Sequence, residues 1–353
     1  MENYQVENLK EYIDTIDKIQ TRCMEDFCFS QKRPDNTEKN IKEANKELKK
    51  YFTAVSKKAQ KLYECSLEKN KTSFEEKFNV FYDDRVKFFY RGHRDIKYKL
   101  LPSVFRKNNW EYEDVYFHEM IAHCPNYFQY NSHLDKLVTM QHYDCPTRLL
   151  DITSNPLIAL YFACNDPSNE KNPPSIGEVN VFFTLSQEIV YSDSDKALIL
   201  SCLPRFNKNE KNILLQKANE FLDNGKFEQI MDNSEYLDEF VEKLYHEITN
   251  EAPAFKRELV PLDLLKPLFI QPNKTNARII KQDGAFIISG LSANVHDATK
   301  KLEALVCAKI KIKNKKSILK DLSMLGIHEA SLFPEVDKVA HFLRENIEDE
   351  KMN

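Results

Sequence analysis

Apolar side chains recur every three or four positions through the first part of the chain, a spacing that places them on one face of a helix. The first such run contains Leu9, Tyr12, Ile13, Ile16 and Ile19. A second run of the same kind extends over residues 38–70. Because only a short polar stretch separates the two runs, we expect an antiparallel N-terminal helical hairpin within residues 1–75.

The pattern changes near residue 78, where aromatic and β-branched residues become frequent. The segments "FNVFYDDRVKFFYRG" and "SIGEVNVFFTLS" are typical of strands, and "LFIQP" and "GAFIISG" predict two shorter ones. Helical patterns are found at residues 112–124, 132–143, 155–166 and 209–249 and again near the C-terminus. We therefore expect an α+β fold in which helices wrap a mixed, largely antiparallel sheet.

These patterns divide the chain into an N-terminal helical region (1–75), a central domain (78–290) and a C-terminal helical region packed on the core (291–353). With 42% hydrophobic and 30% charged residues, the 353-residue chain has a globular composition. Its net charge of −4 argues against a general nucleic-acid-binding surface but leaves room for a local basic site. The chain has no apolar run of about 18 residues, so we expect a cytoplasmic protein without a membrane partner.

The glycines and cysteines exclude several kinds of site. Only six glycines occur, and neither a GxGxxG nor a GxxxxGK[ST] pattern is present, which argues against Rossmann and P-loop nucleotide sites. The eight cysteines are scattered without CxxC spacing, so we expect reduced, mostly buried thiols and predict no metal.

Chemically versatile residues concentrate in four segments, "FFYRGHRD", "MQHYDCPTRLLDITSNPLIALYFA", "ARIIKQDGAFIISG" and, more weakly, "APAFKRELVPL" (252–262). The candidate site residues that they supply are Tyr90, Arg91, Gly92, Gln141, His142, Thr147, Arg148, Asp151, Thr153, Ser154 and Gln282. Gly92 offers room for a ligand or another strand to approach. His93 and Arg94, which follow it, are interpreted as turn residues.

Each candidate also has a purely structural interpretation. His142 could cap the end of a helix, and Arg148 and Asp151 could form an ion pair with each other. The stretch around Thr153 and Ser154, with Asn155 and Pro156, could serve only to start a helix. Taken together, however, buried cationic and carboxylate groups are expensive unless they are paired, and they concentrate at functional sites.

The motifs "FYRGH", "YKLLPSVFR", "MQHYDCPTRLLDITSNPLIALYFA" and "RIIKQDGAF" occur here in the order found in the FRG domain, named for its Phe/Tyr-Arg-Gly motif. The chain resembles that family over roughly residues 78–290. It departs from the family pattern at three positions of the second block. Asp144 stands where glycine is usual, Cys145 where leucine is common, and Ile152 where tryptophan is typical.

A weaker resemblance is to ADP-ribosyltransferases of the Arg-Ser-Glu type, which implies an ADP-ribosyltransferase-like core with NAD as a candidate substrate. By that resemblance Arg91 would hold the pyrophosphate, and Thr153 or Ser154 would orient the nicotinamide ribose. The late acidic motif of those enzymes has no counterpart, because Gln282 and Asp283 occupy the nearest place; a glutamine cannot act as a base, whereas Asp283 could. The resemblance to the FRG family implies a bacterial toxin or antiviral phage-defence effector acting on a macromolecule.

In this hypothesis His142, Ser154 and Gln282 are the catalytic candidates, and the other candidate residues bind substrate or nucleotide. The partners would be a nucleotide-like small molecule and a target that is a protein or a nucleic acid. Two alternatives remain open. One is a non-enzymatic module that binds a phosphate, a nucleotide or nucleic acid, and the other is a nuclease-type hydrolase using His142 and Asp151.

Overall fold

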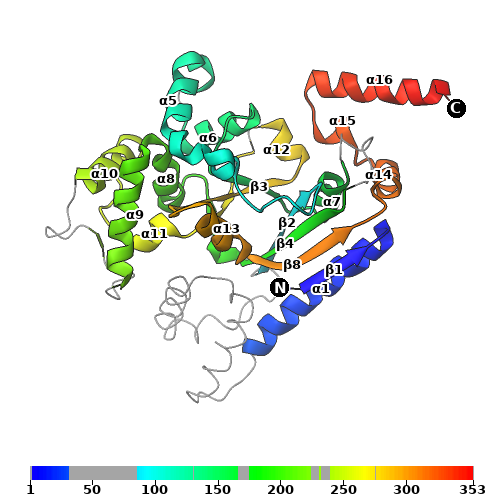
Figure 1. Cartoon of the computed structure of the whole chain (residues 1–353), viewed down its shortest axis with the longest axis horizontal. Coiled ribbons are helices and arrows are strands. Elements are labelled where there is room, and N and C mark those ends of the chain that lie inside the picture. The colour runs from blue at the N-terminus through cyan, green and yellow to red at the C-terminus, as the bar shows by residue number, and fades with distance from the viewer. Residues whose placement is uncertain are drawn as a thin grey trace.

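The computed structural model describes residues 2–31, 86–129, 131–165, 175–223, 230–231, 239–274 and 276–352. Its centre is an eight-stranded sheet with the order β1-β8-β4-β2-β3-β7-β6-β5 (Figure 1). The strands are β1 (Glu2–Val6), β2 (Val86–His93), β3 (Leu149–Thr153), β4 (Gly177–Leu185), β5 (Ile189–Tyr191), β6 (Leu268–Gln271), β7 (Gly284–Ile288) and β8 (Val306–Ile312). The pairs β1–β8 and β5–β6 are parallel and the others antiparallel, which confirms a mixed, largely antiparallel sheet.

Helices surround this sheet and confirm the α+β class. The longer ones are α1 (Leu9–Gln31), α5 (Glu113–His123), α6 (His133–His142), α7 (Pro156–Cys164), α8 (Asp195–Cys202), α9 (Lys208–Asp223), α10 (Glu239–Glu251), α13 (Val295–Glu303), α14 (Lys315–Met324) and α16 (Val336–Met352). The shorter ones are α11 (Pro261–Leu265), α12 (Ala277–Lys281), α15 (Glu329–Leu332) and the 3₁₀ segments η1 (Ser103–Tyr112), η2 (Pro125–Tyr127), η3 (Ser186–Glu188) and η4 (Leu203–Arg205). None of the helices in the described ranges is both long and apolar enough to cross a membrane.

Two glycines allow α7 to pack closely on the sheet. A Cβ atom on Gly92 would lie 2.0 Å from the carbonyl oxygen of Ala159, and one on Gly177 would lie 2.3 Å from that of Ala163. Both distances are far shorter than atoms tolerate, so only glycine fits beneath the helix. The neighbour that needs the space at Gly92 is thus a helix, where we had expected a ligand or another strand.

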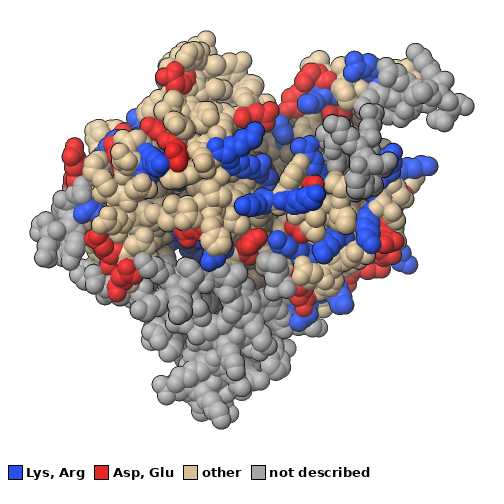
Figure 2. Space-filling model, viewed as in Figure 1, with Lys and Arg blue, Asp and Glu red and all other residues tan. Residues whose placement is uncertain are grey.

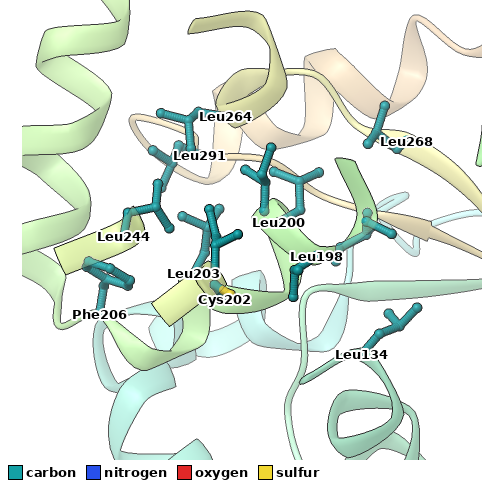
Figure 3. Packing of buried hydrophobic residues seen from close by; sticks show 14 of the residues in the cluster. Leu134, Leu198, Leu200, Cys202, Leu203, Phe206, Leu244, Leu264, Leu268 and Leu291 are labelled. Carbon is teal, nitrogen blue, oxygen red and sulfur yellow. The ribbon is translucent and has the colours of Figure 1, made fainter. Parts of the chain in front are cut away.

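Helices α5, α6 and α8–α11 form a lobe with its own apolar core beside the β5–β6 edge (Figures 1 and 3). The buried residues labelled in Figure 3 are Leu134, Leu198, Leu200, Cys202, Leu203, Phe206, Leu244, Leu264, Leu268 and Leu291. A second core lies under α1, α7 and α14, on the face of the sheet that Gly92 presents. The two groups of helices therefore cover different parts of the sheet. The candidate site lies on the strands between these two groups.

The terminal regions are less purely helical than expected. α1 confirms the first predicted helix, but residues 2–6 before it form strand β1, and β8 lies inside the region 291–353. These two strands pair with each other, so both ends of the chain extend the same sheet. The second helix predicted at 38–70 lies outside the described residues.

The sheet splits between its two middle strands. β2 pairs with β4 from Val86 to His93, but it pairs with β3 at a single position, Tyr90 opposite Thr153. β3 in turn pairs with β7 along its whole length. In a regular antiparallel ladder Gly92 would lie opposite Asp151. The strands diverge there instead and leave a gap that other groups must fill.

Candidate functional site

A cavity of about 310 Å³ lies at the split between β2 and β3. Its walls come from these two strands, from β7, and from η1, α6, α7 and α12. The predicted site residues that line it are Tyr90, Arg91, Gly92, Gln141, His142, Asp151, Thr153 and Gln282. Thr147, Arg148 and Ser154 do not line it. Segments far apart in the sequence therefore converge on one cavity of ligand size.

Arg91 spans the gap where the strands diverge. Its Nη1 donates to the main-chain oxygen of Asp151 at 2.5 Å and lies 3.7 Å from Oδ2 of the same residue, while its Nε donates to Nε2 of His93 at 3.3 Å. Burial lowers the pKa of Arg91, and the charge of Asp151 opposes that shift. The guanidinium thus satisfies a strand carbonyl that the ladder leaves unpaired.

His93 is part of this arrangement and not the turn residue that we expected. It is the last residue of β2 and is buried. Burial and the nearby positive charges, first that of Arg91, lower the pKa of His93 to about 3. The imidazole is therefore neutral at physiological pH and acts as the acceptor for Arg91.

Gln141, at the end of α6, orients the carboxylate of Asp151. Its Nε2 donates to Asp151 Oδ1 at 2.6 Å, and its Oε1 accepts from the hydroxyl of Thr147. Thr147 thus acts on the cavity through Gln141. Asp144, which follows α6 and also lines the cavity, has φ 59°. A left-handed backbone of this kind is one that glycine adopts without strain.

The turn before β7 binds the end of β3. The hydroxyl of Thr153 donates to the main-chain oxygen of Gln282 at 2.7 Å, and that of Ser154 approaches the oxygen of Asp283 at 3.4 Å. Asn155 caps α7 through its side-chain oxygen and donates to the Asp283 carboxylate at 3.1 Å. Ser154 therefore holds a turn next to the cavity, while Thr153 and Gln282 form part of its wall.

Arg148 lies in a buried ion cluster behind β3. It donates to the two carboxylate oxygens of Glu113 at 2.9 and 2.5 Å and to the main-chain oxygen of Ser289 at 3.0 Å. Lys211 also donates to Glu113, at 2.8 Å. The structural interpretation in which Arg148 and Asp151 pair with each other is wrong, because Arg148 pairs with Glu113 and Asp151 with Arg91. The cluster joins α5 and α9 to the strand that carries Asp151.

Two further arginines, which were not among the predicted site residues, also line the cavity. Arg106 belongs to η1 and is exposed, and Arg278 belongs to α12 and lies over the ring of Phe333 at 4.8 Å. Both occur in motifs quoted above for the FRG family, the signal that could have identified them. Lys and Arg side chains gather near the middle of the face shown in Figure 2, where α6, α12 and β2 meet in Figure 1.

The balance of charge at the cavity is positive. Its lining holds three arginines, at 91, 106 and 278, and two carboxylates, at 144 and 151. One carboxylate, that of Asp151, already pairs with Arg91. An anionic ligand would offset the excess positive charge of the lining.

His142 lines the cavity without a catalytic partner there. Its Nε2 lies 3.0 Å from Oε1 of Glu335, and its ring packs edge-on against Tyr143. No hydrogen bond joins His142 to Asp151 among the described residues. The part of the chain that the structure describes also contains no cluster of three His, Cys, Asp or Glu side chains that could hold a metal ion. Among the described residues His142 is therefore paired with Glu335, and Asp151 with Arg91 and Gln141.

The structure thus combines an open α+β sheet with an arginine-lined cavity at its split. The family model of the FRG domain matches residues 86–172. The chain thus contains an FRG domain, which supplies β2, η1, α5, α6, β3 and α7. The match ends before β7 and α12, which complete the cavity. No curated protein and no solved structure matches the chain.

Proposed function

We propose that the cavity at the split sheet binds a small molecule bearing a pyrophosphate, with NAD as the candidate substrate. The observation that carries the proposal is the convergence of Arg91, Arg106 and Arg278 on one cavity. Guanidinium groups bind phosphate oxygens in bidentate pairs and remain charged when partly buried. Arg106 is the most exposed of the three and the one best placed to contact a ligand.

The reaction we propose is transfer of ADP-ribose from NAD to a macromolecular target. The bond between nicotinamide and the ribose carbon breaks, nicotinamide leaves, and a nucleophile of the target attacks that carbon and releases a proton. Asp151 is well suited to accept the proton or to stabilise the positive charge on the ribose, because its carboxylate is 63% exposed at the cavity and fixed by Gln141. Transfer of ADP-ribose to a macromolecule is a reaction suited to a toxin or antiviral effector, and we propose this role for the protein.

Calorimetric titration of the full chain with NAD, ADP-ribose and inorganic pyrophosphate tests the binding. Arg106→Ala should weaken ADP-ribose binding by about tenfold or more, since a charge-assisted hydrogen bond contributes ~1.5–3 kcal/mol. The matched control is Lys107→Ala, which removes an exposed cation next to Arg106 but outside the cavity lining. Equal affinities of Arg106→Ala and the unchanged protein for all three probes would refute the proposal.

Nicotinamide release tests the chemistry separately from binding. Asp151→Asn keeps an oxygen that can accept from Gln141 and removes the charge. We expect ADP-ribose to bind this variant within a few-fold of the unchanged protein and nicotinamide release to fall by at least about a hundredfold, the scale of general base catalysis. Tight binding with no release by either protein would favour the non-enzymatic binding module.

A further inference from the structure

The C-terminal part of the chain returns to the cavity and lies against one of its walls. Residues 332–335, which we call the strap, run from the last residue of α15 to the residue before α16. The main-chain oxygen of Leu332 accepts from Nε2 of Gln282 at 3.1 Å, and Oε1 of Glu335 lies 3.0 Å from Nε2 of His142. Two of the three catalytic candidates are thus bound by the strap.

The aromatic residue of the strap contacts two more residues of the cavity wall. The Phe333 ring lies 4.8 Å below the guanidinium of Arg278 and meets the ring of Phe162 edge-on at 6.0 Å. Arg278 and Phe162 line the cavity from α12 and α7. The strap therefore binds side chains from α6, α7 and α12, three elements that surround the site.

We infer that the strap is an autoinhibitory lid that must move before a nucleotide-sized ligand can bind. This inference rests on the proposed function, since it concerns the same cavity. With the strap in place the cavity measures about 310 Å³, near the lower end of the ~300–1,000 Å³ range of small-molecule pockets. NAD, with two nucleosides and a pyrophosphate, is a large ligand for such a space. Arg278, His142 and Gln282 already line the cavity, and opening the strap breaks its contacts with them and lets these side chains move apart.

The contacts of the strap are of a kind that opens readily. The His142–Glu335 pair is partly exposed, and the second carboxylate oxygen of Glu335 is buried without a hydrogen-bond partner among the described residues. An unsatisfied buried oxygen weakens the closed state. Local opening of a short segment requires much less free energy than unfolding.

α16 follows the strap directly along the chain. The helix runs away from the sheet along the edge of the molecule (Figure 1). Its Phe342 stacks on His328 at 4.5 Å, and its His341 lies 3.3 Å from Glu329, so these contacts go to α15 and the residue before it. Leu332, the last residue of α15, is buried in the second core, so the part that can move is the strap from Phe333 to Glu335.

The test compares ADP-ribose binding to the full chain and to a release variant that combines Phe333→Ala with Glu335→Gln. Loss of an aromatic contact, a cation–π contact and an ion pair should tighten binding about tenfold, because the open form becomes the more populated one. The matched control is Phe255→Ala, which removes a half-buried ring from the helical lobe, away from the cavity. Its affinity should stay within about twofold of the unchanged protein.

Hydrogen exchange provides a second measurement that needs no change in affinity. Amides of residues 328–342 should exchange faster in the release variant, and also in the unchanged protein when ADP-ribose is added. Equal affinities of the release variant and the unchanged protein for ADP-ribose would overturn the lid while leaving the proposed ligand intact. Absence of binding to both proteins would overturn the proposed ligand and, with it, the role of the lid.

Discussion

The buried cluster behind β3 predicts a specific dependence of stability on pH. Glu113 is 3% exposed, and its carboxylate accepts from Arg148 and Lys211. The positive charges of Arg148 and then Lys211 outweigh the opposing effect of burial and lower the pKa of Glu113 from 4.5 to about 2. Because the pKa is lower in the folded protein, the contribution is fully present above pH 4.5 and is lost as pH falls through 2.

The magnitude follows from the shift. Two and a half pH units correspond to about 3.4 kcal/mol of stability at pH 7, and the same linkage leaves about 1.4 kcal/mol at pH 3. Glu113→Gln removes the charge and keeps the shape of the side chain. We therefore expect the variant to be less stable than the unchanged protein by about 3 kcal/mol at pH 7, within the range found for broken buried ion pairs. The difference should shrink by more than half at pH 3.

Urea denaturation at pH 7, 5 and 3 measures both quantities. Glu188→Gln is the control, because Lys266 also lowers the pKa of Glu188 but the pair is about half exposed. Solvent screening should limit its effect to less than about 1 kcal/mol. A constant stability difference between Glu113→Gln and the unchanged protein from pH 7 to pH 3 would refute the assignment, since the loss would then not depend on ionisation.

Two further predictions concern β2. Gly92→Ala should destabilise the protein by at least about 3 kcal/mol in urea denaturation, because its Cβ would meet a main-chain oxygen of α7 at 2.0 Å. Gly326→Ala is the control, because a Cβ there has no atom within 4 Å and only the φ of 79° disfavours it. This variant should lose about 1 kcal/mol of stability, and equal losses from the two variants would contradict the packing argument. His93 has a pKa of about 3 in the fold against 6.5, so the stability it contributes is present above pH 6.5 and falls by about 2 kcal/mol between pH 7 and pH 5. His93→Gln should flatten that slope in denaturation at the two pH values, and an unchanged slope would show that His93 is not the group responsible.

Local signals in the sequence predicted the elements that local interactions stabilise. The helical pattern at 132–143 corresponds to α6, where the side chain of Ser132 accepts from the backbone N–H of Asp135. Asn155 caps α7 with Pro156 in the first turn, as the sequence indicated. In both cases a side chain bonds the backbone two or three residues away, so a short stretch contains the whole interaction.

The strands that form the cavity depend on distant partners and were harder to predict. β3 is the stretch "LLDIT", which lies between two helices and gains its strand structure from pairing with β7 and, at one position, with β2. The partner of Arg148 is likewise 35 residues away, one carboxylate among 55. Charge and spacing cannot select such a partner, because several nearby acids fit equally well until the chain is folded.

The position of the cavity follows from how β3 continues into α7. β3 ends at Thr153, which is held to β2 opposite Tyr90, and α7 begins three residues later and packs directly on Gly92. The chain is thus fixed at both sides of this short turn. β2 and β3 can separate only beyond the Tyr90–Thr153 pair, toward Gly92 and Asp151. Arg91 lies at the start of that separation and bonds the freed oxygen of Asp151. The Tyr-Arg-Gly sequence of β2 therefore supplies, in order, the residue paired with β3, the arginine at the gap and the glycine under the helix, which explains on physical grounds why these three residue types occur together.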